Sequence, residues 1–334
     1  MRGEEGTTKL SFVEHIVVHE PFLRVGCMLG EGPLYEAQTF TLHFVDIFEK
    51  RVRVRCETSS NHVVPQSQVF HLDIRTLELS IDQYDEPITC LALRRGGRGL
   101  ACATASGIAT IEEGKLQYLA RPIEVEDRPY TRFNDGACDS EGRFFIGTMF
   151  SKEKGIPGVL YKFDPKDMSC VVVDPGPFTD SNGIAWSLDE RTMYFTDSLN
   201  NVIYAYDYED GVISGRRVFA DTGSILRLKN SYPDGLCMDD EGCIWSARWG
   251  GSCIVRFNRE GIIDVQIDLP TVHRVTACCF GGLNNDELFI TTAHCSVLGG
   301  NNDLQKGHPD SGHLFKVEFA GKYRGGRWRH EFAL

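Results

Sequence analysis

Four oxygen-bearing side chains stand one or two positions before a glycine in similar segments of the chain. They are Glu31, Asn134, Asn182 and Asp234. Carboxylate and amide oxygens are hard ligands, which suit a divalent cation when several of them converge. Each motif taken alone is also a common turn sequence, because Asn, Asp and Gly tolerate a positive φ angle. The interpretation as a site therefore depends on a fold that brings the four positions together.

The fold is indicated by short strands in a repeated pattern. Apolar residues alternate with a period of two in segments such as 192–197 and 287–292, which is typical of strands. Three segments, 134–148, 181–197 and 233–247, align without gaps and read as a strand, an acidic turn and a second strand. With weaker copies, the repeat has six anchors 43 to 58 residues apart, at positions 32, 90, 136, 183, 235 and 278. A strand repeat of this length predicts an all-β, six-bladed β-propeller.

The propeller prediction gives the four oxygen-bearing residues a common place. The first strand of each repeat should line the central channel, so the residue just before that strand lies at the channel mouth. Because the four residues hold this position in different repeats, we expect them to converge on one axis. The sequence therefore predicts a metal site in the central channel.

The whole chain, residues 1–334, is expected to form a single propeller domain. Residues 1–9 are polar and are predicted to form a disordered tail. Residues 10–18 are predicted to form a strand that closes the last blade and protects its edge. Two loops look like insertions, 59–68 and 299–310, and the second is a candidate lid over the channel mouth.

Charge narrows the classes of partner. The formal net charge is −12, from 35 Lys and Arg against 47 Asp and Glu, which argues against a nucleic-acid partner. One basic segment, Arg-Arg-Gly-Gly-Arg at 94–98, resembles an RNA-binding motif. It falls where the other repeats have a hairpin turn, so we expect it to be solvated.

Cysteine usage and hydropathy indicate the compartment. The 12 Cys lie mostly in apolar runs without a Cys-x-x-Cys pair, which favours buried thiols in a reducing compartment. No apolar stretch is long enough for a membrane span, and no signal-peptide pattern is present. We therefore expect a cytoplasmic protein without a membrane partner, and the sequence leaves its oligomeric state open.

Seven motifs in register resemble the SMP-30/gluconolactonase/luciferin-regenerating-enzyme family. They lie between residues 20 and 318 and are Gly30-Glu-Gly-Pro33, Phe44-Val-Asp-Ile47, Arg132-Phe-Asn-Asp-Gly136, Gly147-Thr-Met149, Ser181-Asn-Gly-Ile-Ala-Trp-Ser187, Pro233-Asp-Gly235 and Cys278-Cys-Phe-Gly-Gly282. Each motif is weak alone, but their common order makes the set specific. The family fold is a six-bladed propeller, in agreement with the repeat count.

The resemblance implies a ligand set and substrate contacts. One divalent cation would be held by Glu31, Asn182 and Asp234. Their oxygen atoms favour Ca²⁺, with Zn²⁺, Mg²⁺, Mn²⁺ or Fe²⁺ as alternatives. The implied substrate-binding residues at the pocket are Arg132, Asn134 and Lys152. Lys152 falls near a position that carries an acid in vertebrate members, so the vertebrate substrate preference does not carry over.

The implied reaction is hydrolysis of a small lactone, such as that of a sugar acid. The cation would polarise the ester carbonyl, and Asp234 is the candidate catalytic residue. The attacking water is activated either by Asp234 or by the cation, and ligation to the cation would weaken Asp234 as a base. Two alternatives remain on the same fold: hydrolysis of an organophosphate triester, and calcium binding by a regulatory protein without turnover.

Overall fold

The computed structural model describes residues 13–48 and 67–334. The predicted tail at 1–9 and all but the last two positions of the loop 59–68 lie outside the described residues. Strands make up most of the secondary structure in the described ranges. The prediction of an all-β chain is therefore confirmed.

Helical structure is confined to short pieces in the ranges that the structure describes. One α-helix, α1 (Asn302–Gly307), lies inside the predicted insertion 299–310. Two 3-10 turns, η1 (Thr222–Ser224) and η2 (Leu226–Leu228), follow one another in a single connection. No helix in these ranges is long and apolar enough to cross a membrane.

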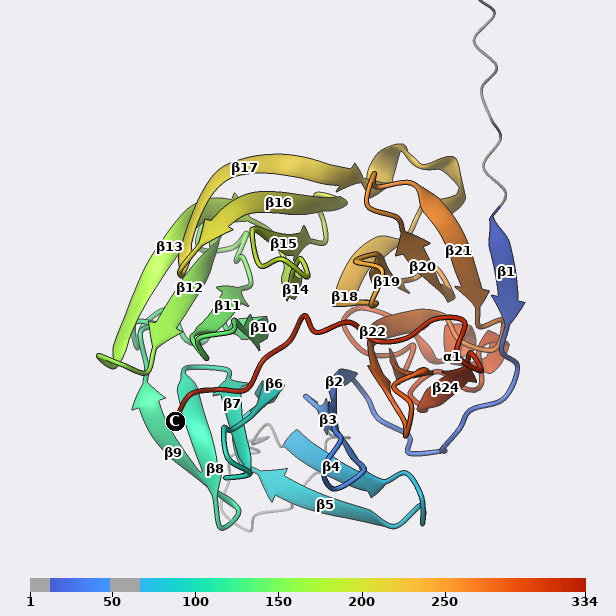
Figure 1. Cartoon of the computed structure of the whole chain (residues 1–334), viewed down its shortest axis with the longest axis horizontal. Helices are drawn as coiled ribbons and strands as arrows, with labels where there is room; N and C mark the ends of the chain where they lie inside the picture. The colour runs from blue at the N-terminus through green and yellow to red at the C-terminus, as the bar shows by residue number, and fades with distance from the viewer. Residues whose placement is uncertain (1–12, 49–66) are drawn as a thin grey trace, which may run out of the picture.

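Four antiparallel sheets of four strands each are arranged around a common axis (Figure 1). The first contains β2 (Gly30–Glu36), β3 (Thr41–Asp46), β4 (Ser67–Asp73) and β5 (Leu79–Tyr84). The second contains β6 (Ile88–Leu93), β7 (Leu100–Thr104), β8 (Ile108–Glu112) and β9 (Lys115–Ala120). The third contains β10 (Phe133–Cys138), β11 (Phe144–Thr148), β12 (Gly158–Asp164) and β13 (Ser169–Phe178). The fourth contains β14 (Ser181–Trp186), β15 (Thr192–Asp197), β16 (Val202–Glu209) and β17 (Val212–Asp221).

The fifth sheet has eight strands, which differs from the prediction of six separate blades. Its first part contains β18 (Tyr232–Met238), β19 (Ile244–Trp249), β20 (Cys253–Phe257) and β21 (Ile263–Asp268). Its second part contains β22 (Arg274–Gly281), β23 (Glu287–Ala293) and β24 (Phe315–Glu318). One residue pair, Trp249 with Arg274, joins the two parts. The propeller-like arrangement is confirmed, but four blades and one larger sheet replace the six predicted sheets.

The predicted closing strand also pairs differently from the prediction. β1 (Glu14–Val17) runs parallel to β21 at the edge of the larger sheet and does not pair with β24. The apolar side chains explain this place, because Ile16 packs against the core cluster that contains Val265 and Ile267. The edge of the second part is contacted instead by the chain after β1, where Leu23 bridges to Leu314.

Six inner strands form a closed ring around the axis (Figure 1). In order, each contacts the next, and the last contacts the first: β2, β6, β10, β14, β18 and β22. Glycines permit this close approach. A Cβ on Gly183 would lie 2.5 Å from the backbone nitrogen of Leu236, and one on Gly235 would lie 2.5 Å from the Cβ of Ala277.

The hydrophobic core lies between neighbouring sheets. Between the third and fourth sheets, Phe145 packs edge to face on Trp186 with ring centroids 5.4 Å apart.

All eleven cysteines in the described ranges are free thiols and ten of them are buried. The prediction that cysteines serve as small buried side chains is confirmed for those residues.

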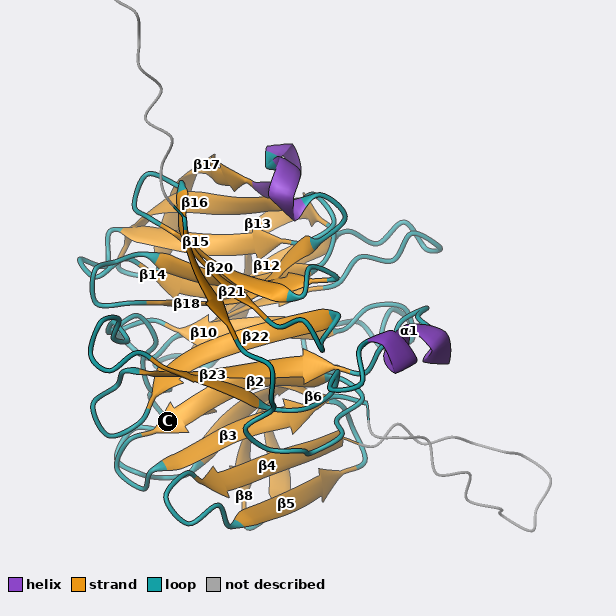
Figure 2. Ribbon diagram, turned by 90° about the vertical axis from the view of Figure 1, so that its right-hand side faces the viewer, coloured by secondary structure: helices purple, strands orange, loops and turns teal. Residues whose placement is uncertain are grey.

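Residues 320–334 form a tail that crosses one face of the ring (Figure 1). Three isolated bridges hold it, namely Gly325 with Asp239, His330 with Cys138 and Phe332 with Arg94. These partners lie at or just beyond the ends of β18, β10 and β6. The tail therefore covers the face where the inner strands end. α1 lies on the opposite side of the molecule (Figure 2).

Arg329 fixes the tail at the centre of this face. Its Nη1 donates to the carbonyl oxygen of Pro33 at 3.1 Å. Its Nη2 donates to the carbonyl oxygens of Leu91 at 3.0 Å and Gly136 at 3.3 Å. These carbonyls belong to β2, β6 and β10, so one guanidinium group joins three inner strands.

The substitution Arg329→Met tests this role because it keeps an unbranched side chain but removes the charge and the donors. We expect the free energy of unfolding to fall by about 2–4 kcal/mol, since three carbonyl groups lose a charged donor. Urea titration and thermal denaturation would measure the change. Arg324→Met, at an exposed position of the same tail, should change stability by less than about 0.5 kcal/mol. Equal losses in the two variants would contradict the assignment.

Candidate active site

The predicted site residues lie at irregularities of the inner strands. The register of pairing with the next strand shifts at Glu31/Leu34 in β2, Phe133/Gly136 in β10, Ser181/Ile184 in β14 and Pro233/Leu236 in β18. Such a bulge leaves extra residues unpaired and changes the direction of the local side chains. Glu31, Asn134, Asn182 and Asp234 each stand at or within one of these shifts. The same irregularity therefore recurs at the four positions that the repeat aligned.

A chain of side-chain hydrogen bonds joins three of the predicted residues across two sheets. The Nη1 of Arg132 donates to the Oδ1 of Asn134 at 2.6 Å, and the Nδ2 of Asn134 donates to the Oδ1 of Asn182 at 2.9 Å. The Nδ2 of Asn182 then donates to the hydroxyl of Ser198 at 2.7 Å. Arg132 also donates to the carbonyl oxygen of Phe133 at 2.9 Å. These bonds fix the orientation of both amides, with their oxygens toward neighbouring donors.

Glu31 and Asp234 supply the two carboxylates of the predicted set. Asp234 is buried, with 6% of its surface exposed. Burial and the nearby charge of Asp135 raise the pKa of Glu31 to about 8, although Arg132 opposes the shift. Burial and the charge of Glu31 raise the pKa of Asp234 well above its usual range. Like charges in a poorly solvated site disfavour ionisation of both groups, and a bound cation would reverse that effect.

Two further aspartates belong to this acidic cluster and were not predicted as site residues. Burial raises the pKa of Asp135 and raises that of Asp180 to about 6. The charges of both residues also raise the pKa of Asp234. The Oδ1 of Asp180 is buried without a hydrogen-bond partner among the described residues. In the sequence, both aspartates lie next to predicted site residues: Asp135 follows Asn134, and Asp180 stands two positions before Asn182.

Two arginines border the acidic cluster. Burial lowers the pKa of Arg132 to about 10, although Asp180, Glu31 and Asp234 oppose the shift. Arg248 in β19 is fully buried, and burial also lowers its pKa to about 10 while Asp234 opposes the shift. Its Nη2 donates to the carbonyl oxygen of Ser231 at 3.0 Å. No motif marked Arg248 in the sequence. It reaches the site because β19 pairs with β18, with Arg248 opposite Pro233.

Lys152 is not brought into the hydrogen-bonded chain. It is exposed in a turn between β11 and β12, and no contact between it and the other predicted residues is found in the part of the chain described. The turn does lie at the same end of the sheet as Arg132, because the backbone N–H of Met149 donates to the carbonyl oxygen of Arg132 at 3.0 Å. Lys152 therefore stands on the face of the site but outside its centre.

A second acidic group lies away from the channel mouth. Asp239, Glu241 and Cys243 place potential ligand atoms within 4.8 Å of one another. Arg256 already neutralises this group, with its Nε 2.6 Å from the Oδ2 of Asp239 and its Nη2 bonded to Glu241. The Nε1 of Trp245 also donates to the Oδ2 of Asp239 at 2.9 Å. These contacts indicate a structural ion-pair network after β18.

The cluster at the channel mouth combines hard oxygens with guanidinium groups. Glu31, Asn182 and Asp234 can supply oxygen ligands to a cation, while Arg132 can donate to an oxygen that carries developing negative charge. These side chains lie in or next to the inner strands β2, β10, β14 and β18, which Figure 1 shows around the axis. A polar substrate with an electrophilic carbonyl fits this combination.

Comparisons with known proteins support the family resemblance that the sequence motifs indicated. A model of the SMP-30/gluconolactonase/LRE-like region matches residues 29–294. Regucalcin of Xenopus laevis is 34% identical over 298 residues, covering 86% of this chain and 90% of that protein. A pentonolactonase of Haloferax volcanii is 32% identical over 302 residues, covering 88% of this chain and 92% of that protein.

Solved structures share the fold. A luciferin-regenerating enzyme aligns with a TM-score of 0.78 and 25% identity, covering 95% of this chain and 99% of that one. A regucalcin of Agrobacterium tumefaciens aligns with a TM-score of 0.80 and 22% identity, covering 97% of this chain and all of that one. With the family match and the curated relatives, the conclusion follows that the chain belongs to the SMP-30/gluconolactonase/luciferin-regenerating-enzyme family.

Proposed function

We propose that the chain is a metal-dependent lactonase that opens a small lactone, such as that of a sugar acid. The observation that carries this proposal is the convergence of Glu31, Asn182 and Asp234 with Arg132 and Asn134 at one mouth of the channel. The pentonolactonase relative, 32% identical over 302 residues, supports lactone hydrolysis as the class of reaction. The substrate partner would be a small molecule that enters from this face.

The position of the proposed site depends on counting the second part of the larger sheet as a sixth blade. β22 supports this reading, because it contacts both β18 and β2 and so completes the ring of inner strands. The link to the first part is a single pair, Trp249 with Arg274. On this reading the channel is central to six blades, and the proposed metal site lies on its axis.

The residues present fit a divalent cation. Glu31, Asn182 and Asp234 would hold it, and all three offer hard oxygen atoms, which favours Ca²⁺ over softer ions. The buried Oδ1 of Asp180 lacks a partner among the described residues, so the cluster has unused acceptor capacity. Burial and neighbouring carboxylates raise the pKa values of Glu31 and Asp234, and a bound cation would oppose both effects. Elemental analysis of the purified protein would distinguish Ca²⁺ from Zn²⁺, Mg²⁺, Mn²⁺ or Fe²⁺.

Different side chains would serve different steps of the hydrolysis. A bound divalent cation supplies Lewis-acid polarisation of the lactone carbonyl. Arg132, oriented by its bond to Asn134, would donate to substrate oxygens and hold the ring in place. Asp234 would accept a proton from the attacking water at its carboxylate, although ligation to the cation makes this group a weaker base than it is in the metal-free protein. As the ring C–O bond breaks, this proton passes to the leaving alkoxide oxygen.

Removal of one carboxylate provides the most direct test. Asp234→Ala should reduce kcat/KM for aldono-lactones by at least about a thousandfold and abolish stoichiometric binding of the cation, because it removes a ligand and the proton acceptor. A pH-indicator assay over a panel of pentono- and hexono-lactones, with and without chelator, would measure the loss. Asp240→Ala removes an equal charge at an exposed position beyond the other end of β18 and should retain activity.

The same assay separates the alternatives. Hydrolysis of lactones at the wild-type rate by Asp234→Ala would refute the assignment of this residue. Acid release from organophosphate triesters but from no lactone would favour the phosphotriesterase alternative. Calcium binding without hydrolysis of either class would favour a regulatory protein.

Lys152 is proposed as a contact for the substrate at the rim of the site. Because the side chain is exposed, we expect Lys152→Ala to raise KM by about twofold to fivefold and to leave kcat nearly unchanged. Steady-state kinetics on the best lactone would measure both constants. Lys115→Ala, exposed on β9, is the control. A fall in kcat with constant KM would contradict a rim contact.

The raised carboxyl pKa of Glu31 predicts a pH dependence of stability in metal-free protein. The folded state binds this proton more tightly than the unfolded chain. The resulting stabilisation is complete below 4.5, the ordinary pKa of a glutamate side chain, and is lost as pH rises through about 8. We expect the thermal midpoint of chelator-treated protein to fall across this range, and added Ca²⁺ to restore it most at the upper end. Glu31→Gln should flatten the profile. Identical profiles for the variant and the wild type would contradict the shift.

A further inference from the structure

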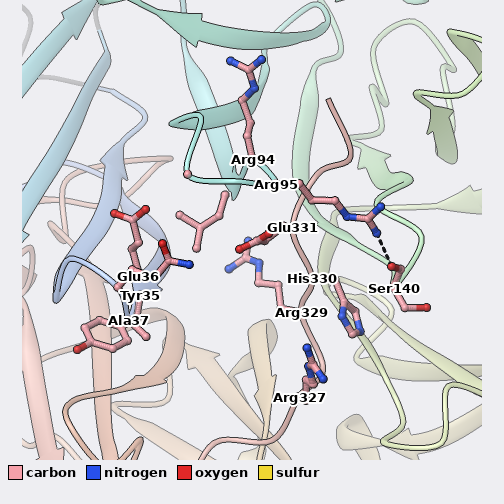
Figure 3. A pocket seen from close by; sticks show the side chains of 13 residues that line it. Tyr35, Glu36, Ala37, Arg94, Arg95, Ser140, Arg327, Arg329, His330 and Glu331 are labelled. Carbon is pink, nitrogen blue, oxygen red and sulfur yellow. Dashed lines mark hydrogen bonds between the residues drawn. The ribbon is translucent and has the colours of Figure 1, made fainter.

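A pocket of about 390 Å³ lies beside the tail (Figure 3). Four segments that are distant in sequence line it: the end of β2 with its turn, the end of β6 with its turn, Ser140 after β10, and residues of the tail between 327 and 331. The tail pairs with the ends of the inner strands, whereas the proposed site lies where these strands begin. The pocket is therefore separate from the proposed lactonase site and opens on the other face.

The pocket is basic although the protein as a whole is acidic. Four arginines line it, Arg94, Arg95, Arg327 and Arg329, against two carboxylates, Glu36 and Glu331. The chain carries a formal net charge of −12, so a concentration of guanidinium groups in one cavity is not a consequence of composition. Two segments with the same order, Arg-Gly-Gly-Arg at 95–98 and at 324–327, supply part of this charge.

The four arginines are not equally engaged. Arg329 is committed to three backbone carbonyls and forms a fixed part of the wall. Arg94 bonds to Glu112 and to the carbonyl oxygen of Leu334. Arg95 is exposed, and within the described residues its side chain makes one hydrogen bond, from Nη2 to the carbonyl oxygen of Ser140 at 2.6 Å, dashed in Figure 3. Arg327 is exposed, and no hydrogen bond or ion pair of its side chain occurs within residues 13–48 and 67–334. Arg95 and Arg327 therefore retain donors for a ligand.

The backbone of the turn that carries Arg95 has a defined conformation. Gly96 and Gly97 have φ angles of 75° and 69°, a left-handed conformation that a residue with a Cβ adopts only at a cost. The bridge between Arg94 and Phe332 ties this turn to the tail that carries Arg327. Arg95 and Arg327 thus line one cavity from two segments that are tied together.

We propose that this pocket binds a small organic anion with at least two negative charges, through phosphate or carboxylate groups held by Arg95 and Arg327. A guanidinium fork matches the paired oxygens of either group, and such charge-assisted bonds are strong. The volume is within the range of small-molecule sites. Two carboxylates in the lining select for compact anions that reach the arginines without contacting Glu36 or Glu331.

The test is titration calorimetry of the full chain with two probes, inorganic pyrophosphate and citrate, at low ionic strength. We expect at least one probe to bind with 1:1 stoichiometry. The double variant Arg95→Gln/Arg327→Gln should weaken binding at least about tenfold. The matched control Arg98→Gln/Arg324→Gln removes two exposed arginines from the same two segments, outside the pocket, and should bind as the wild type does. The probe that binds more tightly identifies phosphate or carboxylate as the preferred group.

Several results would overturn the proposal. Absence of binding by both probes at millimolar concentration would do so. Equal weakening in both double variants would indicate general attraction to a basic surface and no site. Tight binding of a single-stranded RNA oligonucleotide, lost equally in both double variants, would assign this face to a macromolecule. Because the variants lie on the face opposite Asp234, loss of anion binding with lactone hydrolysis intact is distinguishable from failure of the lactonase proposal.

Discussion

The close approach of the inner strands around the axis is the constraint on which the rest of the structure depends. At Gly183 and Gly235 the next strand leaves no room even for a methyl group, so the ring closes only because those positions lack a Cβ. The register shifts occur at the same places. Ring closure and the orientation of Asn182 and Asp234 therefore have one origin, and a change that relaxes one also disturbs the other.

Closure of the ring brings buried carboxylates close together, and arginines offset part of the resulting unfavourable electrostatic energy. Four carboxylates, Glu31, Asp135, Asp180 and Asp234, interact near the axis, and burial raises the pKa of each. The Arg132 guanidinium opposes this shift for Glu31 and Asp180. On the far face, Arg329 partly offsets the raised pKa of Asp135. The acidic residues near the axis thus have a compensating arginine on each face of the ring.

The sequence predicted the parts of this arrangement that recur. The propeller-like arrangement and the inner position of Asn134, Asn182 and Asp234 follow from a repeated local pattern, and the burial of the described cysteines follows from their place in apolar runs. Features that depend on one tertiary contact were not predictable. Arg248 reaches the site only because β19 pairs with β18. β1 pairs with β21 because of side-chain packing. The pair Trp249–Arg274 joins two repeats into one sheet. Asp135 and Asp180 lay beside predicted residues, but their mutual proximity is a property of the closed ring.

The path of the tail has a consequence for the order in which the ring is completed during synthesis. Pro33, Leu91 and Gly136 lie in the first half of the chain, but the guanidinium group that joins their carbonyls is at position 329. The first three sheets therefore leave the ribosome well before their shared donor does. Until then these carbonyls lack the donor that joins them in the folded protein. We therefore expect the contact between the first three sheets to be completed only after nearly all of the chain is available.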